Sequence, residues 1–295
     1  MGRRDFLKKS LKASAAFGLE FLLGNKPARG DFSLDRRIQM AYNYSKFSGV
    51  NGDLDRSWIT LAYSQNYDAD SEVFVKHQNK INNFINENRL NYGSTTLAML
   101  SVAYAYMGAD KGLENVVKDL HKEAQDITGG DIDAAWVTLA YARTYSSNPT
   151  RFNQNKQKIN EFLGQNKNRG STVSSMLSLA YAASGFKDIN SVYNTFIKDK
   201  NGDIDSSWLT LAVASSDNPQ QAINTILNKY NNEFRWHGTT TGAILALSYA
   251  MSGFEDIMPT FKRYYSYTNG DINGSLLTLA YAQALNPNNK LFPKR

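Results

Sequence analysis

Carboxylate side chains recur in pairs along this 295-residue chain, at spacings that suit chemistry at the start of a helix. The repeated motif is Gly-Asp-x-Asp, followed by an apolar run. Its four copies carry Asp53 and Asp55, Asp131 and Asp133, Asp203 and Asp205, and Asp271 with Asn273 in the second place. Carboxylates accept hydrogen bonds from sugar hydroxyls, bind hard cations such as Ca²⁺ and act as general bases. A structural interpretation stands beside this chemistry: the first Asp caps a helix and the second lies against the positive end of its dipole.

A tryptophan follows three of the four pairs. Trp58, Trp136 and Trp208 each come five residues after the first Asp, which places them about one helical turn deeper. If these helices begin on one face of a ring, we expect the aspartates to surround a cleft with the indoles beneath them. Because indole faces stack on pyranose rings, this arrangement predicts polysaccharide binding. The alternative interpretation of the tryptophans is core packing.

A second motif alternates with the first and defines the elements that must position these residues. Its copies are Tyr92-Gly93-Ser94-Thr95-Thr96, Arg169-Gly170-Ser171-Thr172 and His237-Gly238-Thr239-Thr240. Successive motifs lie 33 to 40 residues apart, the length of one helical hairpin. The first helix of each hairpin is apolar nearly all round, and the second has an i, i+3, i+4 stripe such as Ile81, Phe84 and Ile85. We therefore predict an all-α fold, either an α/α toroid or a tightly curved superhelix of six to seven hairpins.

The positive charge of the chain is concentrated at its N-terminus. Residues 1–30 contribute about five units of the formal net charge of +6, so the charge does not indicate nucleic-acid binding. The run Gly2-Arg3-Arg4-Asp5-Phe6-Leu7-Lys8 resembles a twin-arginine export signal. This resemblance implies a signal peptide over 1–30, one mature domain over 31–295, and a periplasmic or extracellular location without membrane attachment after cleavage. An uncleaved amphipathic anchor is the alternative.

The chain has no cysteine and three histidines, His77, His121 and His237. Without cysteine there are no disulfides, iron–sulfur clusters or thiolate metal sites. His77 and His121 lie in outer-helix patterns and are expected to be solvated surface residues. His237 lies beside a Gly-Thr-Thr turn and is a candidate substrate-binding residue. We expect no cofactor and no metal, with Ca²⁺ at a Gly-Asp-x-Asp turn as the one ion that the residue types allow.

The helix-start motifs resemble those of family 8 of the glycoside hydrolases, inverting endo-enzymes on β-1,4-linked glucans, xylans or chitosan with an (α/α)6 toroid. The segment Gly130-Asp131-Ile132-Asp133-Ala134-Ala135-Trp136 is similar to one family motif, and Ser171-Thr172-Val173-Ser174-Ser175-Met176-Leu177 to another. The family's general acid is a Glu in that second motif, where all three copies here have Ser or Thr. An inverting hydrolase needs an acid and a base about 6.5–9.5 Å apart. The acid must therefore come from elsewhere, and Glu233 and Asp35 are the candidates.

The sequence thus predicts a secreted carbohydrate-active protein that binds a β-1,4-linked polysaccharide, with hydrolysis as a further expectation. The predicted catalytic residues are Asp131, Asp203 and Glu233. The predicted substrate-binding residues are Asp53, Asp55, Asp133, Asp205, Asp271, Trp58, Trp136, Trp208 and His237. Two alternatives remain open: a non-catalytic glycan-binding or assembly factor, and an α-solenoid adaptor that binds a protein partner.

Overall fold

The computed structural model describes residues 34–46, 50, 52–67, 71–198, 202–268 and 270–292. These residues form fourteen α-helices, α2 to α15, connected by short loops and 3₁₀ turns, and they contain no β-strand. The predicted all-α fold is confirmed. The predicted signal peptide, residues 1–30, lies outside the described residues.

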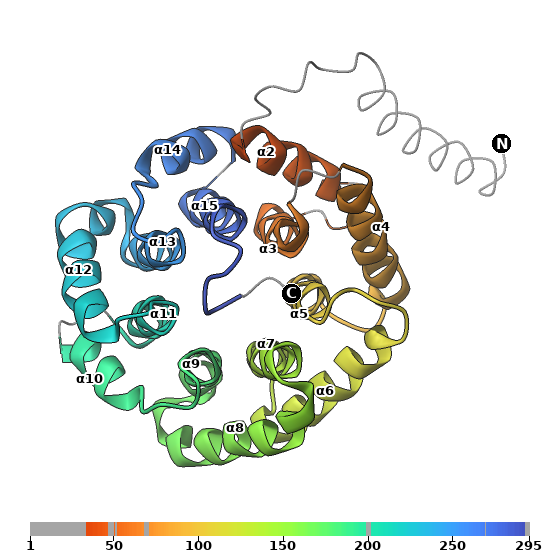
Figure 1. Ribbon diagram of the computed structural model, residues 1–295, viewed down its shortest axis with the longest axis horizontal. Helices are drawn as coiled ribbons and strands as arrows, with labels where there is room; N and C mark the ends of the chain where they lie inside the picture. Colours follow the sequence, from red (N-terminus) through yellow and green to blue (C-terminus); the bar gives the residue numbers. More distant parts are fainter. Residues whose placement is uncertain are drawn as a thin grey trace, which may run out of the picture.

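Seven of the helices form an inner ring (Figure 1). They are α3 (Asp53–Tyr63), α5 (Ser94–Tyr106), α7 (Asp131–Ser147), α9 (Ser171–Ala183), α11 (Asp203–Ala214), α13 (Thr239–Met251) and α15 (Asp271–Leu285). Each packs against the next, and α15 packs against α3. The inner helices are apolar on all sides, as predicted: in α5, every residue from Thr96 to Tyr106 is buried. The arrangement fits the expected toroid, with seven hairpins.

The other seven helices form an outer layer around the ring (Figure 1). They are α2 (Leu34–Ser45), α4 (Ser71–Asn88), α6 (Leu113–Thr128), α8 (Phe152–Asn166), α10 (Asn190–Lys198), α12 (Pro219–Asn232) and α14 (Met258–Tyr267). Their apolar stripes are buried, since Ile81, Phe84 and Ile85 of α4 are at most 2% exposed. Because outer and inner helices alternate along the chain, all inner helices begin on the same side of the ring. We call this side the N-terminal face.

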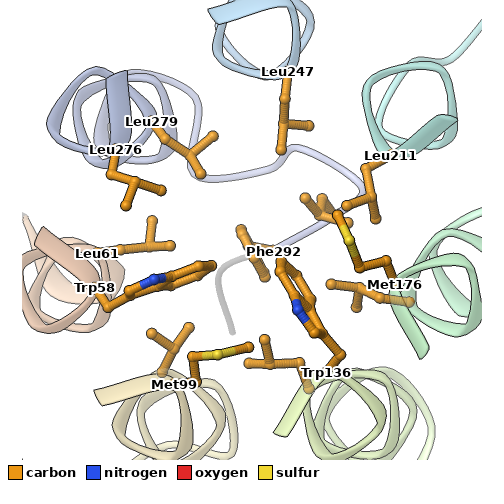
Figure 2. Close-up of a cluster of buried hydrophobic side chains, with 14 of the residues drawn as sticks. Trp58, Leu61, Met99, Trp136, Met176, Leu211, Leu247, Leu276, Leu279 and Phe292 are labelled. Atoms are coloured by element: carbon orange, nitrogen blue, oxygen red, sulfur yellow. The ribbon is translucent and has the colours of Figure 1, made fainter. Parts of the chain in front are cut away.

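Side chains fill the centre of the ring (Figure 2). Trp58 of α3, Trp136 of α7 and Trp208 of α11 contact one another, with ring centroids 5.2 to 6.4 Å apart. Figure 2 shows Trp58 and Trp136. The three tryptophans are 5 to 6% exposed. One turn further along the helices lies a layer of leucines that includes Leu61 and Leu211. The middle of the ring is therefore hydrophobic core.

The C-terminal segment covers the opposite face of the ring. Leu291 and Phe292 are 0 and 2% exposed, and Phe292 points into the centre (Figure 2). The backbone of this segment is held by side chains near the ends of inner helices: the Tyr106 hydroxyl donates to the carbonyl of Leu291 at 2.9 Å, and Arg143 Nε donates to the carbonyl of Lys290 at 2.9 Å. This segment, which we call the plug, thus lies at the C-terminal ends of the inner helices, opposite the N-terminal face.

The two ends of the helical repeat meet at a seam between the first and last hairpins. In the outer layer, Asp35 of α2 is ion-paired with Arg263 of α14 and accepts a hydrogen bond from the Tyr264 hydroxyl at 3.2 Å. Burial, with Asp35 nearby, raises the pKa of Tyr264, so the phenol remains a proton donor. Asp35, one candidate for the general acid, therefore joins the first hairpin to the last.

No helix in the described part of the chain is both long and apolar enough to cross a bilayer.

Candidate functional site

The first turn of an inner helix directs three successive side chains to three different neighbours, because residues in an α-helix are about 100° apart. In the Gly-Asp-x-Asp copies, the N-cap residue is the glycine, which has no side chain to make a cap hydrogen bond. The interpretation of the first Asp as the helix cap is therefore wrong. This Asp is instead the first residue of the helix, where its charge still faces the positive end of the dipole.

The first Asp of the motif ties its inner helix to the outer helix that precedes it. In three copies its carboxylate accepts a hydrogen bond from that outer helix. The donor–acceptor pairs are Tyr42–Asp53 at 2.6 Å, Gln125–Asp131 at 2.7 Å and Tyr193–Asp203 at 3.3 Å. Asp53 also pairs with Arg56 at 3.0 Å. Burial, together with the hydrogen bond to Asp53, raises the pKa of Tyr42, which keeps this donor protonated.

The second Asp ties its inner helix to the next inner helix of the ring. Its carboxylate accepts a hydrogen bond from a Ser or Thr in the first turn of that neighbour. The pairs are Thr95–Asp55 at 2.7 Å, Ser171–Asp133, and Thr240–Asp205 at 2.8 Å. Asp55 and Asp205 are only 5 and 7% exposed. The Gly-Asp-x-Asp motif thus supplies the acceptor, and the Ser/Thr motif the donor, of a repeated hydrogen bond that joins α3 to α5, α7 to α9 and α11 to α13.

Exposed large hydrophobic side chains gather at the N-terminal face. The middle residue of each Gly-Asp-x-Asp copy is aliphatic and 39 to 42% exposed; these residues are Leu54, Ile132, Ile204 and Ile272. Others lie where outer helices end and lead into inner ones: Leu90, Ile127, Trp236, Tyr265 and Tyr267. Val73, near the start of α4, is the exception. Nine of the ten large hydrophobic side chains that are exposed in the described part of the chain thus lie on this face, which makes it the candidate functional site.

The predicted site residues occupy two different environments at this face. The seven aspartates lie in the first turns, with Asp131 and Asp203 exposed and Asp271 half-buried. Trp58, Trp136 and Trp208 lie beneath them and cover one another, a position that fits core packing. Their role in substrate binding stays a prediction.

The two other predicted residues lie at the rim of the face, on the loop between α12 and α13. Glu233 directly follows α12 and is ion-paired with Lys229 of that helix. The hydrogen bond between Lys229 and Glu233 raises the pKa of Lys229. His237 is half-buried, with its ring centroid 5.0 Å from that of Phe261 on α14. Both residues flank Trp236, which the sequence analysis did not select.

The remaining histidines differ from the expectation. His77 and His121 are 3 and 1% exposed, so the expectation that they are solvated is wrong. His121 lies between α6 and α7, with Nδ1 3.4 Å from Thr138 Oγ1 and its ring edge-on to Tyr92. Burial lowers the pKa of His121, although Asp131 nearby opposes the shift. The signal was available in the sequence, because His121 shares an apolar stripe with Val117.

Trp236 is the functional candidate that the sequence analysis missed. It is 83% exposed, whereas the other three tryptophans are almost fully buried. It belongs to the 3₁₀ turn η5 (Phe234–His237), which leads directly into α13. Its position between Arg235 and His237, outside any apolar stripe, was the available signal.

Comparison with known proteins gives no relative for this arrangement. No protein-family model, curated protein or solved structure matches the chain. The resemblance to family 8 of the glycoside hydrolases, whose toroid has six hairpins where this ring has seven, stays a prediction. Among the described residues, no three His, Asp or Glu side chains come together as a set of metal ligands.

Proposed function

We propose that this chain is an exported glycan-binding protein, and that it binds a β-1,4-linked polysaccharide on the N-terminal face of its ring. The observation that carries the proposal is the exposure of three aromatic side chains on this face, Trp236, Tyr265 and Tyr267, at 83, 51 and 41%. Aromatic rings offer flat apolar surfaces for the C–H faces of sugars. The exposed carboxylates of Asp131 and Asp203 supply acceptors for sugar hydroxyls.

Binding without turnover is favoured over hydrolysis. The buried carboxylates of Asp55 and Asp205 are occupied by hydrogen bonds within the ring. Glu233, the predicted general acid, is engaged in an ion pair with Lys229 of α12. The catalytic roles predicted for Asp131, Asp203 and Glu233 are therefore the weaker part of the hypothesis.

Binding of a protein partner is the second candidate function. It is favoured by the four aliphatic side chains of the Gly-Asp-x-Asp copies, which are exposed at equivalent positions of α3, α7, α11 and α15. Aliphatic groups contribute little to the recognition of a sugar, but they fit apolar side chains of a protein.

A binding and cleavage screen on the full chain separates these functions. The probes are cellulose, xylan, chitosan and mixed-linkage glucan, each assayed for bound protein and for new reducing ends. We expect binding without cleavage. Cleavage that is lost in Asp131→Asn or Asp203→Asn while folding is retained would instead establish a hydrolase. If no glycan is bound or cleaved, the glycan proposal fails and the protein-partner function takes its place.

Export is tested separately by fractionation of the native host. We expect the mature chain outside the cytoplasm, beginning near Asp31, and retention inside the cell when Arg3 and Arg4 are both replaced by Lys. Full-length protein in the cytosol of the unmodified strain would refute this part of the proposal.

A further inference from the structure

The loop between α12 and α13 holds Trp236 in a fixed position at the rim of the N-terminal face. The residues on either side of it are anchored: Phe234 is fully buried, and His237 packs edge-on against Phe261. The indole itself is 83% exposed. A rigid turn therefore presents a large apolar ring to solvent, although burial of that ring would stabilise the fold.

The turn η5 packs closely against α13 because α13 has a glycine at the point of contact. Gly242 lies in the first turns of α13, and a Cβ atom at this position would approach the backbone C and O of Phe234 to 2.9 Å. Glycine in a helix interior is less favourable than alanine, so its presence here is explained by the approach of the turn. Gly274 has the equivalent position in α15, where a Cβ would lie 3.1 Å from the backbone of Tyr265. The two helical glycines of the ring thus support the two segments that carry exposed aromatic residues.

These two segments are connected by packed rings. The ring of Phe261 lies 5.0 Å from that of His237 and 6.0 Å from that of Tyr265. Tyr265 is 51% exposed. His237, the residue after Trp236, is therefore linked through Phe261 to Tyr265 at the end of α14. Two exposed polar residues are close in sequence: Arg235 lies on the same turn, and Thr239 is the first residue of α13.

We propose that Trp236 is the principal stacking residue of a sugar subsite at this rim, with Tyr265 as a second aromatic surface on the same face and Arg235 and Thr239 as hydrogen-bonding groups. The inference rests on the proposed glycan-binding function and locates it in one sector of the face. The chemistry of the sector favours a sugar as its occupant, since flat rings alternate with polar groups. The aliphatic residues near the axis lie outside this subsite.

The test compares Trp236→Ala with Val73→Ala, a control that removes an exposed apolar side chain, 42% exposed, away from the N-terminal face. Soluble hexasaccharides of cellulose, xylan and chitosan are the probes, and dissociation constants are measured by calorimetry. We expect Trp236→Ala to weaken binding at least tenfold and Val73→Ala to leave it within twofold. Tryptophan fluorescence gives a second readout, because sugar binding should shift the emission of the wild-type chain but not of Trp236→Phe.

Three outcomes decide the matter. Weakening confined to Trp236→Ala supports the subsite. Equal binding by wild type and Trp236→Ala overturns the subsite while the glycan-binding function stands. No binding by the wild type overturns both. Acrylamide quenching, compared between wild type and Trp236→Phe, checks the premise without a ligand: a Trp236 that is shielded from the quencher would also overturn the subsite.

Discussion

Replacement of Phe292 by Ala tests whether the C-terminal segment is an integral part of the core. The side chain is 2% exposed, its ring lies 4.6 Å from that of Tyr106, and it points into the centre of the ring (Figure 2). Truncation of a buried Phe to Ala typically costs about 3–5 kcal/mol, through lost burial and the cavity left behind. A terminal segment can also detach, which limits the loss to the free energy that holds it.

Detachment sets the lower end of the expected range. Burial of Leu291 and Phe292 contributes roughly 1.5–3 kcal/mol for each side chain, less the cost of ordering the segment. We therefore expect Phe292→Ala to reduce the free energy of unfolding by about 3 kcal/mol. In a chain of this size, that corresponds to a fall in melting temperature of about 6–12 °C.

The assay is equilibrium unfolding in urea, followed by far-ultraviolet circular dichroism, with thermal melts in parallel. Phe292→Leu conserves most of the volume and should cost less than about 1.5 kcal/mol. Leu90→Ala removes an exposed side chain and should change stability by no more than about 0.5 kcal/mol. A loss below about 1 kcal/mol for Phe292→Ala would refute the inference that the plug completes the core.

Further predictions concern the ring itself. Thr95→Val removes the hydrogen-bond donor to the buried carboxylate of Asp55 and should lower the free energy of unfolding by about 1.5–3 kcal/mol. Thr172→Val should be nearly neutral, because the neighbouring Ser171 is the donor in that copy. Equal effects of the two variants in urea melts would contradict the assigned hydrogen bonds. Gly242→Ala should destabilise the fold by about 1–3 kcal/mol through overpacking against the backbone of Phe234. Gly164→Ala, which has open space around it, should stabilise the fold by up to about 1 kcal/mol. A stabilising effect of Gly242→Ala would show that the turn η5 does not need to approach α13 so closely. Because burial lowers the pKa of His121, the unfolded state takes up a proton first, so stability should be full above about pH 6.5 and fall as the pH is lowered from there. A His121→Gln variant should lack this part of the slope, and melts at pH 7.5 and 5.5 that show the same difference in both proteins would disprove the assignment.

The helical architecture could be predicted because its signals are local. An apolar helix followed by an amphipathic one, repeated at a hairpin's length, determines which faces must be buried. The stripe of Ile81, Phe84 and Ile85 is buried as predicted. The first-turn position of the second Asp also followed from the motif, whereas the first Asp, predicted as the cap, is the first residue of the helix. The bonding partners of both could not be predicted.

The burial of individual aromatic residues could not be predicted in the same way. Trp136 and Trp236 both lie close to a glycine turn in the sequence, yet one is 5% and the other 83% exposed. Trp236 lies on the turn η5, whereas Trp136 lies on an inner helix, where the diameter of the ring brings three indoles together at its centre. The diameter depends on how many hairpins close the ring, which is a property of the whole chain. The insertion of Phe292 likewise depends on a space that only the closed ring creates.

The number of hairpins has a consequence of its own. Two types of inner helix alternate along the chain, one beginning with an acidic pair and the other with Ser or Thr, but a closed circle of seven members cannot alternate without one mismatch. The mismatch falls between α15 and α3, which are both of the acidic type. At this joint Asn273 replaces the second Asp, so two carboxylates do not face each other, and Leu276 stands where the other copies have Trp. The parity of the circle thus leaves a unique boundary in an otherwise repetitive molecule, and it explains why the last copy of the motif departs from the other three.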